Sequence, residues 1–339
     1  MAWIGLDIGG ANLKAAFPGS PDCPAMEMPF PMWTDWRKLE EAIAKLVARA
    51  DSADSIAVTM TGELADNFEN RMAGVFYIAD AVERVCGNQR IVYYSCDGVW
   101  RSRKELEQGW DLVAAANWHA TATWGARLLP DRSGLVIDVG STTTDVSLVE
   151  SGVVATDSQN DLQRLTIGEL LYVGADRTPI CGLLSHVRYA QQRIALANEL
   201  FATVGDAAIW KKRVPEFPEL VRTADGRPRT RLASGQRMAR MLCRDRDDLD
   251  SDLIDAIADQ TIAAAEAAIG ETVSKRLASC DAKVAHALIV GEGQFLVTEA
   301  IKLVGSDIKV VSLADEIGEM ASVCGPAHSV AVLASEDLA

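Results

Sequence analysis

The chain has 339 residues, of which 49% are hydrophobic and 24% are charged, a composition typical of a folded protein long enough for two domains. Its net charge of −15 argues against non-specific binding to nucleic acid or to an anionic membrane surface, and no apolar run approaches the ~20 residues of a membrane helix. The seven cysteines form no CxxC pair and the four histidines show no metal-site spacing, so the sequence predicts a cytoplasmic protein without a disulfide framework or a histidine-built metal site.

In the first 129 residues, apolar runs with strand spacing alternate with runs that have helical spacing. The opening stretch AWIGLDIGGANLKAAF predicts a strand, a turn and a second strand. Helices are expected over 35–50, 72–87 and 110–129, the last ended by Pro130, and strands over 55–61 and 89–98. This alternation is typical of an α/β protein.

The rest of the chain repeats this alternation after the clearest hairpin in the sequence. In SGLVIDVGSTTTDVSLVESGVVA, two apolar runs surround a Gly-Ser-Thr turn, and a further turn is expected at Ser151 and Gly152. Residues 161–281 are expected to be mostly helical, with an arginine-rich part that contains Pro and Gly loop markers. The remaining expected elements are a strand, glycine turn and helix over 285–304, a strand over 308–313 and a helix over 324–336.

Two hairpins, one at the start of the chain and one in its middle, share the same order of residues. In both IGLDIGGANLKAAF and LVIDVGSTTTDVSLV, an apolar strand ends in Asp, an apolar residue and Gly, and a small polar turn leads to a second strand. Small turn residues let backbone N–H groups converge on an anion, so these segments are either plain hairpins or two halves of a phosphate cradle. Asp7 and Asp138 could face each other across a cleft and hold a hydrated Mg²⁺.

With three further features, this pair of hairpins resembles the actin/Hsp70/sugar-kinase superfamily. The matching segments are a first phosphate loop at 7–14, a second at 138–145, a connecting helix at 111–129, an adenosine-type strand–Gly–helix at 288–295 and a closing helix at 325–334. They span nearly the whole chain.

The resemblance implies an α/β fold of two ribonuclease-H-like domains, the actin-like ATPase fold, with an interdomain cleft. The first domain is expected to comprise residues 1–129 together with the closing helix at 325–339, and to carry the first phosphate loop. The second is expected to comprise residues 130–324, with the second loop, the arginine-rich helical insertion and the adenosine-type motif.

The resemblance also implies roles for individual loop residues. Asp7 and Asp138 match the ligands of Mg²⁺ and its waters. Lys14 matches a lysine that some members place against phosphate, although a lysine on the exposed side of a strand is an equally plain interpretation. The positions that match phosphate contacts are Gly9, Gly10, Asn12, Gly140, Ser141, Thr142 and Thr143.

The adenosine-type motif departs from the superfamily pattern. Two adjacent small residues are usual there, whereas here Glu292 stands between Gly291 and Gly293. This carboxylate could hydrogen-bond a ribose or could obstruct a nucleotide. Mg²⁺ is therefore the expected cofactor, and the residues leave ATP binding open.

Within the superfamily, DVGSTTTDVSLV is similar to the second loop of the hydantoinase-A/oxoprolinase branch. The full sequence is similar to a group of shorter relatives linked to tetrahydromethanopterin-dependent one-carbon metabolism, through AVTMTGELAD, AAANWHATA, YVGADRTPIC and RTADGRP. This resemblance implies a transferase of methylofuran biosynthesis. It would join an aminomethyl-furanmethyl diphosphate to the phenol oxygen of γ-glutamyltyramine, or of a tyrosine equivalent, and release diphosphate. Mg²⁺, Lys14 and the turn amides would stabilise the charge on the leaving group.

Such a reaction needs a base, because a phenol has a pKa of about 10. His119 on the connecting helix and Glu63 after a strand end are the candidates, with Glu169 as a further one. The alternatives are a half-buried structural histidine and a solvated loop acid. We expect Asn117 to orient a substrate and Asp145 to fix the second hairpin.

A basic segment interrupts the acidic chain. Residues 211–246 contain eleven Lys or Arg against four Asp or Glu, so the segment carries +7 and the rest of the chain −22. Because arginine forks suit carboxylates and phosphates, we expect Arg227, Arg229 and Arg231 to bind the glutamyl carboxylates or the diphosphate. The alternative is a solvated helix face paired with neighbouring acids. Aromatic residues do not interleave with these charges, which argues against nucleic acid.

Two other functions use the same loops. One is an ATP-dependent small-molecule kinase or a hydantoinase-like ATPase. The other is a non-catalytic nucleotide-sensing protein whose domains close on their ligand. The expected partners are the diphosphate and the γ-glutamyl phenol, with no nucleic acid and no membrane, and the sequence allows a homodimer without requiring one.

Overall fold

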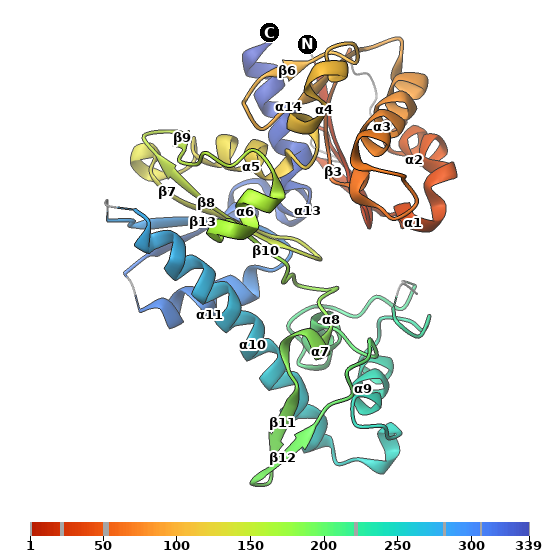
Figure 1. Cartoon of the computed structure of the whole chain (residues 1–339), viewed down its shortest axis with the longest axis vertical. Coiled ribbons are helices and arrows are strands. Elements are labelled where there is room, and N and C mark those ends of the chain that lie inside the picture. Colours follow the sequence, from red (N-terminus) through yellow and green to blue (C-terminus); the bar gives the residue numbers. More distant parts are fainter. Residues whose placement is uncertain are drawn as a thin grey trace.

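Two separate β-sheets organise the chain in the computed structural model, which describes residues 2–20, 24–49, 54–219, 223–280, 283–305 and 307–338 (Figure 1). The first sheet has the order β3 (Ala25–Pro29), β2 (Asn12–Ala16), β1 (Trp3–Ile8), β4 (Ser55–Met60), β5 (Arg90–Tyr94) and β6 (Trp100–Arg101). The second has the order β10 (Leu170–Leu171), β8 (Thr144–Glu150), β7 (Gly134–Val139), β13 (His286–Gly291) and β14 (Lys309–Ser312), and β9 (Val153–Val154) pairs with β8.

The two sheets repeat one topology. In the first, β1 pairs antiparallel with β2 and parallel with β4, which pairs parallel with β5. In the second, β7 pairs antiparallel with β8 and parallel with β13, which pairs parallel with β14. Both first strands are buried along their whole length, as expected for central strands covered on both faces. The expected α/β fold with a hairpin opening each half is therefore confirmed.

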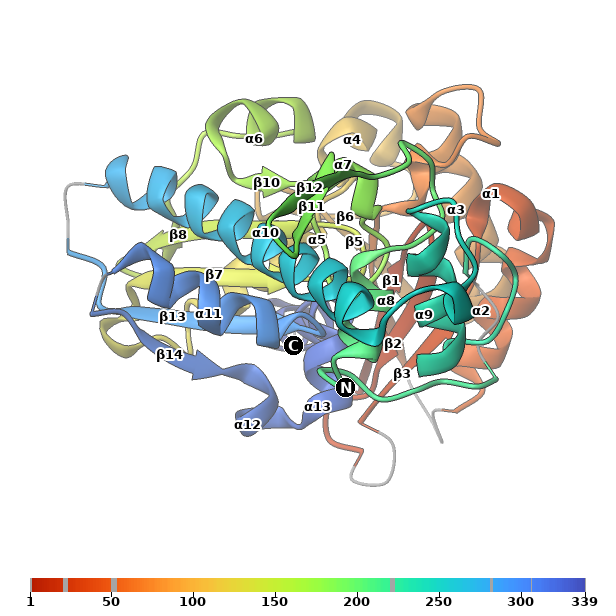
Figure 2. The same cartoon turned by 90° about the horizontal axis from the view of Figure 1, so that it is seen from below.

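Helices cover both faces of each sheet. In the first half, α2 (Leu39–Val47) and α3 (Arg71–Cys86) pack on one face. On the second sheet, α10 (Ser251–Ala278) and α11 (Gln294–Val304) cover one face (Figure 2) and α5 (Asn117–Gly125) packs on the other. The remaining helices are α1 (Met32–Asp35), α4 (Leu106–Val113), α6 (Asp161–Ile167), α7 (Ile180–Leu183), α8 (Val204–Trp210), α9 (Arg231–Arg240), α12 (Leu313–Ile317), α13 (Glu319–Val323) and α14 (Gly325–Asp337), with 3-10 turns at 36–38, 62–64, 130–132 and 246–248.

The C-terminal helix returns to the first sheet. α14 packs on β1, β4 and α5, and the two ends of the chain lie close together in Figure 1. Gly5 permits this contact, because a side chain there would overlap the backbone oxygen of Ala327. A shared core of residues from both sheets, α5 and α14 joins the two halves. The exact division at 129–130 and 324–325 stays a prediction. Among the described residues, none of the helices has the length and apolarity needed to cross a bilayer.

The prediction of one continuous helix over 110–129 is wrong in its middle. The structure has two helices, α4 and α5, separated by residues 114–116. Ala114 forms a parallel bridge with Met60, and Ala115 adopts a left-handed φ of 54°. A run of three alanines has high helix propensity, so this break is decided by the bridge to β4 and not by local preference. The helix expected from residue 35 begins as a 3-10 turn, and Ala50 at its expected end lies outside the described residues.

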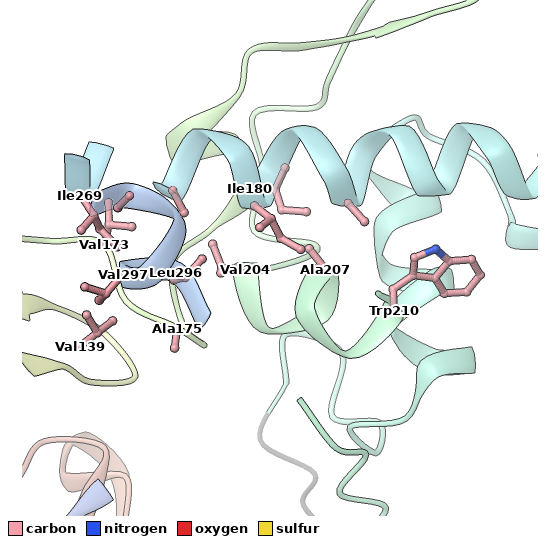
Figure 3. Close-up of a cluster of buried hydrophobic side chains, with 14 of the residues drawn as sticks. Val139, Val173, Ala175, Ile180, Val204, Ala207, Trp210, Ile269, Leu296 and Val297 are labelled. Carbon is pink, nitrogen blue, oxygen red and sulfur yellow. The ribbon is translucent and has the colours of Figure 1, made fainter. Parts of the chain in front are cut away.

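Residues 161–281, expected to be mostly helical, contain α6 to α10, but they also form β10 and the hairpin of β11 (His186–Tyr189) and β12 (Gln192–Ala195). The 28-residue α10 runs from the second sheet to the part of the chain that contains α7, β11, β12, α8 and α9, here called the outer part (Figure 1). One continuous hydrophobic cluster follows it, from Val139 beside the second turn to Trp210 at the end of α8 (Figure 3). The outer part is therefore packed onto the same core as the second hairpin.

Candidate functional site

A cleft of about 580 Å³ lies between the two hairpin turns. Gly10 of the first turn and Ser141 of the second both line it. The predicted site residues that the structure brings together in this cleft are Asp7, Gly9, Gly10, Asn12, Lys14, Glu63, Asn117, Asp138, Gly140, Ser141, Thr142 and Thr143.

The two turns have the same backbone geometry. The N–H of Gly9 donates to the carbonyl of Asn12 at 3.0 Å, and the N–H of Gly140 donates to that of Thr143, also at 3.0 Å. A Cβ at Gly9 would lie 2.6 Å from the Asn12 oxygen. By contrast, a Cβ at Gly10 or Gly140 would meet no described atom closer than 3.9 Å. The space at these two positions is thus open toward the cleft, where a ligand can approach the backbone.

Two carboxylates end the first strands of the hairpins. Asp7 is 6% exposed and Asp138 is 7% exposed. Burial raises the pKa of Asp7 to about 6, against the opposing charge of Lys14. Burial, reinforced by the charge of Asp145, raises the pKa of Asp138 to about 7. Oδ1 of Asp7 has no hydrogen-bond partner among the described residues. Buried carboxylates with raised pKa values and an unpartnered oxygen are suited to hold a cation.

The donor set suits Mg²⁺ better than a transition metal. In the described ranges, no three His, Cys, Asp or Glu side chains cluster closely enough to hold a metal ion by themselves. Mg²⁺, however, commonly uses one or two carboxylates and completes its shell with water and substrate phosphate. Asp7 and Asp138, with the open turn backbones beside them, fit that pattern.

Lys14 lies opposite Asp7 across the first hairpin. Its Nζ donates to the carbonyl of Val323 at 2.8 Å and lies 3.7 Å from Oε1 of Glu27. Burial favours the neutral amine, but the charges of Glu27, Cys324 and Asp7 outweigh it and raise the pKa of Lys14 above its ordinary value. A positive charge is therefore fixed in the cleft wall.

Glu63 is a buried carboxylate in the cleft lining. It lies in the 3-10 turn at 62–64 after β4 and is 2% exposed. Nη2 of Arg71 donates to its Oε1 at 3.4 Å, whereas Oε2 has no partner within the part of the chain that the structure describes. Burial, opposed by Arg71, raises the pKa of Glu63 to about 7. This group can accept a proton near neutral pH.

Asp145 and Arg164 form a buried ion pair in the wall of the cleft. Arg164 is 2% exposed, pairs with Asp145, and pairs with Asp161 at 3.1 Å. Its guanidinium lies 4.2 Å from the centre of the Trp118 ring. Asp145 is thus engaged by Arg164, in agreement with the expected structural part that it plays in the second hairpin.

His119 lies outside the cleft lining, contrary to the expectation of a candidate base there. Its Nδ1 is 2.9 Å from the Tyr94 hydroxyl and 3.4 Å from that of Thr123. Burial lowers the pKa of His119 to about 4. Glu169 is also elsewhere, paired with Arg276 at 3.2 Å in a second hollow. Among the three candidate bases, Glu63 is the one that the cleft contains.

The three arginines expected to bind substrate also lie outside the cleft lining. Arg227 donates to Gln236 at 2.9 Å, and Arg231 donates to the Trp210 carbonyl at 3.0 Å. Arg229 pairs with Asp176 at 2.7 Å. Each of the three is thus engaged by a protein group outside the cleft lining, and their binding of substrate stays a prediction. Arg222 and Cys23 lie outside the described residues.

The loop at 291–293 packs against β7 and is not part of the cleft lining. Gly291 has a left-handed φ of 88°, and a Cβ there would meet the Val139 carbonyl and lie 2.7 Å from Oδ1 of Asp138. A side chain at Gly293 would overlap that of Val139. Burial raises the pKa of Glu292 to about 7. These glycines are therefore required by close packing against β7.

Several lining residues were missed in the sequence. The residues added by the structure are Ala11, Trp33, Thr61, Leu64, Ala65, Asp66, Ala115, Asp161, Arg164, Leu170, Tyr172, Arg177 and Pro326. Arg177 and Tyr172 belong to YVGADRTPIC, a stretch that stands out in the sequence, but nothing local to it indicates contact with the second turn. Trp33 and Asp161 carry no sequence signal that we can identify.

Comparison with known proteins agrees with this architecture. The chain superposes on a ROK family glucokinase from Streptomyces griseus, solved with glucose and AMPPNP, with a TM-score of 0.52 and 14% identity over 99% of this chain and 100% of that one. This likeness confirms the two-domain, actin-like fold.

Two relatives carry the same name, (4-{4-[2-(γ-L-glutamylamino)ethyl]phenoxymethyl}furan-2-yl)methanamine synthase. The Methanocaldococcus jannaschii protein is 29% identical over 338 residues, which cover 99% of this chain and 98% of the relative. The Methanococcus vannielii protein is 28% identical over 210 residues, which cover 61% of this chain and 93% of the relative. Residues 54–325, most of the chain, match the hydantoinase/oxoprolinase family model. The chain therefore belongs to the hydantoinase/oxoprolinase family.

Proposed function

We propose that this protein is the ether-forming transferase of methylofuran biosynthesis. It joins an aminomethyl-furanmethyl diphosphate to the phenol oxygen of γ-glutamyltyramine, or of a tyrosine equivalent, and releases diphosphate. The proposal is supported by the end-to-end match to a synthase whose name describes this ether. The structural observation that carries it is the meeting of both open turns, Asp7 and Asp138 in one cleft.

The reaction breaks the bond between the furfuryl carbon and the diphosphate oxygen. The electron pair leaves with the diphosphate, and a furfuryl carbon supports the positive charge that develops. The amides at Gly10 and Ser141 and the ammonium of Lys14 would stabilise the leaving group in a partly dry site. Asp7 and Asp138 would hold Mg²⁺, which would supply further neutralisation of diphosphate charge.

The phenol oxygen forms the new bond to the same carbon and gives up its proton. Glu63 is assigned as the base, because it lines the cleft, has one unpartnered oxygen and has a pKa raised by burial to about 7. A base with a pKa near the working pH combines a large deprotonated fraction with useful proton affinity. Its bond to Arg71 leaves the second oxygen available to the phenol.

The rest of the cleft suits the other groups of the two substrates. The ether in the relatives' name carries a primary amine, which is protonated at neutral pH, and Asp66 and Asp161 add carboxylates to the lining. Trp33 and Tyr172 provide aromatic surface for a phenol ring. Asn117 enters the cleft at the start of α5, directly after the break in the helix, where its amide can orient a polar group.

The test is to incubate the protein with the furan diphosphate, γ-glutamyltyramine and Mg²⁺ and to measure the ether by mass spectrometry and diphosphate by an enzyme-coupled assay. We expect equal amounts of both, dependent on both substrates. Phosphate release from ATP with no ether would favour the kinase or ATPase, and tight nucleotide binding without turnover would favour the sensor. Omission of Mg²⁺, with a chelator present, is expected to stop the reaction, because Asp7 and Asp138 would then repel the diphosphate.

A further inference from the structure

Arg177 projects from a segment that is fastened to the back of the second turn. Residues 174–177, here called the backing segment, bind the turn through three backbone hydrogen bonds. Ala175 N–H donates to Gly140 O at 2.9 Å, Asp176 N–H to Ser141 O at 3.1 Å and Arg177 N–H to Ser141 O at 2.7 Å. At the other end of the segment, a side chain at Gly174 would collide with the turn backbone. Arg177 therefore moves with the turn.

Trp33 is attached to the first turn in the same manner. The N–H of Met32 donates to Gly10 O at 2.9 Å, and that of Phe30 donates to Ala11 O at 2.8 Å. Trp33 follows directly in α1 and is 42% exposed. The Arg177 guanidinium lies 4.9 Å from the centre of the Trp33 ring. The two side chains thus meet across the cleft, each anchored to one turn.

The Arg177 side chain is available for a ligand. It is exposed, and its Nη1 donates to the Thr142 hydroxyl at a long 3.5 Å. Its charge acts on Asp176, but within the described residues it forms no ion pair, whereas Arg164 in the same lining pairs with two carboxylates. A guanidinium stacked by its face keeps its N–H groups free at the edge, and that edge matches phosphate oxygens.

Apart from Arg164, which is paired with two carboxylates, the cleft lining carries two cations, Lys14 and Arg177. The Lys14 side chain is 15% exposed, beside Asp7, whereas Arg177 is exposed near Thr142. Lys14 lies on the first hairpin and Arg177 is fastened to the second turn, so a chain of two phosphoryl groups that spans the two turns can contact both cations.

We propose that Arg177 binds the terminal phosphate of the donor and makes the site selective for diphosphates over monophosphates. This inference rests on the proposed function in that the donor is taken to be a diphosphate ester. Trp33 acts as a positioning residue, which holds the guanidinium plane over the cleft. The loss of a charge-assisted hydrogen bond to phosphate is expected to weaken binding about tenfold to hundredfold.

The test is calorimetric titration of the full-length protein with inorganic pyrophosphate and with inorganic phosphate, both with Mg²⁺ present. The variants are Arg177→Gln, Arg177→Lys and the control Arg188→Gln, which removes an equal charge from the exposed hairpin of β11 and β12. We expect Arg177→Gln to weaken pyrophosphate binding about tenfold to hundredfold and phosphate binding by less than about threefold, with Arg177→Lys intermediate. Arg188→Gln is expected to change neither.

Unchanged pyrophosphate affinity in Arg177→Gln, or an equal loss for both anions, would overturn the inference. Because the titration needs no turnover, it is separate from the synthase assay. Ether formation with unchanged pyrophosphate affinity in Arg177→Gln would remove this inference alone. Selective loss of pyrophosphate binding in a protein that forms no ether would keep the diphosphate site and remove the proposed reaction.

Discussion

Asp7 and Asp138 hold equivalent positions in two hairpins and share one cleft. Asp7 is opposite Lys14 in the pairing of β1 with β2, and Asp138 is opposite Asp145 in the pairing of β7 with β8. Burial is the largest cause of the raised pKa of Asp138 and the charge of Asp145 is the second, and the charge of Asp7 adds to them. Two desolvated carboxylates that repel each other lower the stability of the free protein and create a strong site for a cation.

Replacing Asp138 with Asn is expected to abolish turnover and to stabilise the metal-free protein. The pKa of Asp138 rises from 3.8 to about 7 on folding, so folding takes up protons and wild-type stability falls as the pH increases through this window. The stabilising effect of Asp138→Asn should therefore grow between pH 4 and 7 and remain constant above, reaching about 1–4 kcal/mol. Denaturant unfolding with EDTA present at pH 5 and pH 8 measures it. A variant that is active, or less stable at pH 8, would contradict the assignment.

Replacing Glu63 with Gln is expected to lower kcat by about 10²–10⁴-fold. In the wild type, kcat/KM should rise as the pH increases through about 7, because the base acts in its deprotonated form and burial raises the pKa of Glu63 to about 7. With saturating Mg²⁺, which keeps Asp7 and Asp138 deprotonated, the variant should lack this dependence. The control is His119→Asn, because His119 has a pKa lowered to about 4 and lies outside the cleft lining. If His119→Asn removed the pH dependence and Glu63→Gln did not, the base would be His119.

Replacing Gly10 with Ala is expected to weaken pyrophosphate binding while leaving the fold intact. The nearest heavy atom to the new methyl group would be the Thr61 carbonyl at 3.9 Å, so the methyl group enters the cleft and not the protein. The methyl group would displace the phosphate from the turn, and a displacement of ~1 Å from the productive position of a reacting group costs about a hundredfold in rate. Calorimetric titration measures the affinity for pyrophosphate, and thermal unfolding measures whether the fold is intact.

The matched variant is Gly9→Ala, whose methyl group would lie 2.6 Å from the Asn12 carbonyl. It should lose about 1–3 kcal/mol of unfolding free energy, as overpacked sites do. If Gly10→Ala bound pyrophosphate as well as the wild type does, the first turn would have no part in phosphate binding.

Replacing Arg227 with Gln is expected to change kcat/KM by less than about twofold, because its contacts with Gln236 and Asp225 belong to the exposed surface of the outer part. Steady-state kinetics with both substrates measure this. A large rise in KM for the γ-glutamyl phenol would restore the original expectation that this loop binds the glutamyl carboxylates.

The two hairpins were predictable because their signals are local. Gly9 stands where the first turn needs a residue without a side chain, Gly140 takes the same place in the second turn, and Asp7 and Asp138 end strands whose apolar runs are unmistakable. Repetition of the pattern in both halves, together with the superfamily resemblance, was enough to predict one cleft between them.

The remaining site depends on contacts between distant segments. The break before Asn117 is decided by the bridge between Ala114 and Met60, which no local pattern records. Arg229 pairs with Asp176. Arg177, which follows Asp176 in the sequence, lines the cleft. Charge density along the sequence therefore indicated arginines that lie outside the cleft lining, because pairing within the fold decides which cations remain available.

The most direct test of the central claim is to place ¹⁸O at the bridge between the furfuryl carbon and the diphosphate and to follow it through one turnover. Cleavage between carbon and oxygen, as proposed for a cleft that holds the diphosphate as leaving group, puts all the label in released diphosphate and none in the ether. Label recovered in a furfuryl alcohol, with phosphate transferred to the phenol, would mean that the bond to phosphorus breaks and would contradict the account.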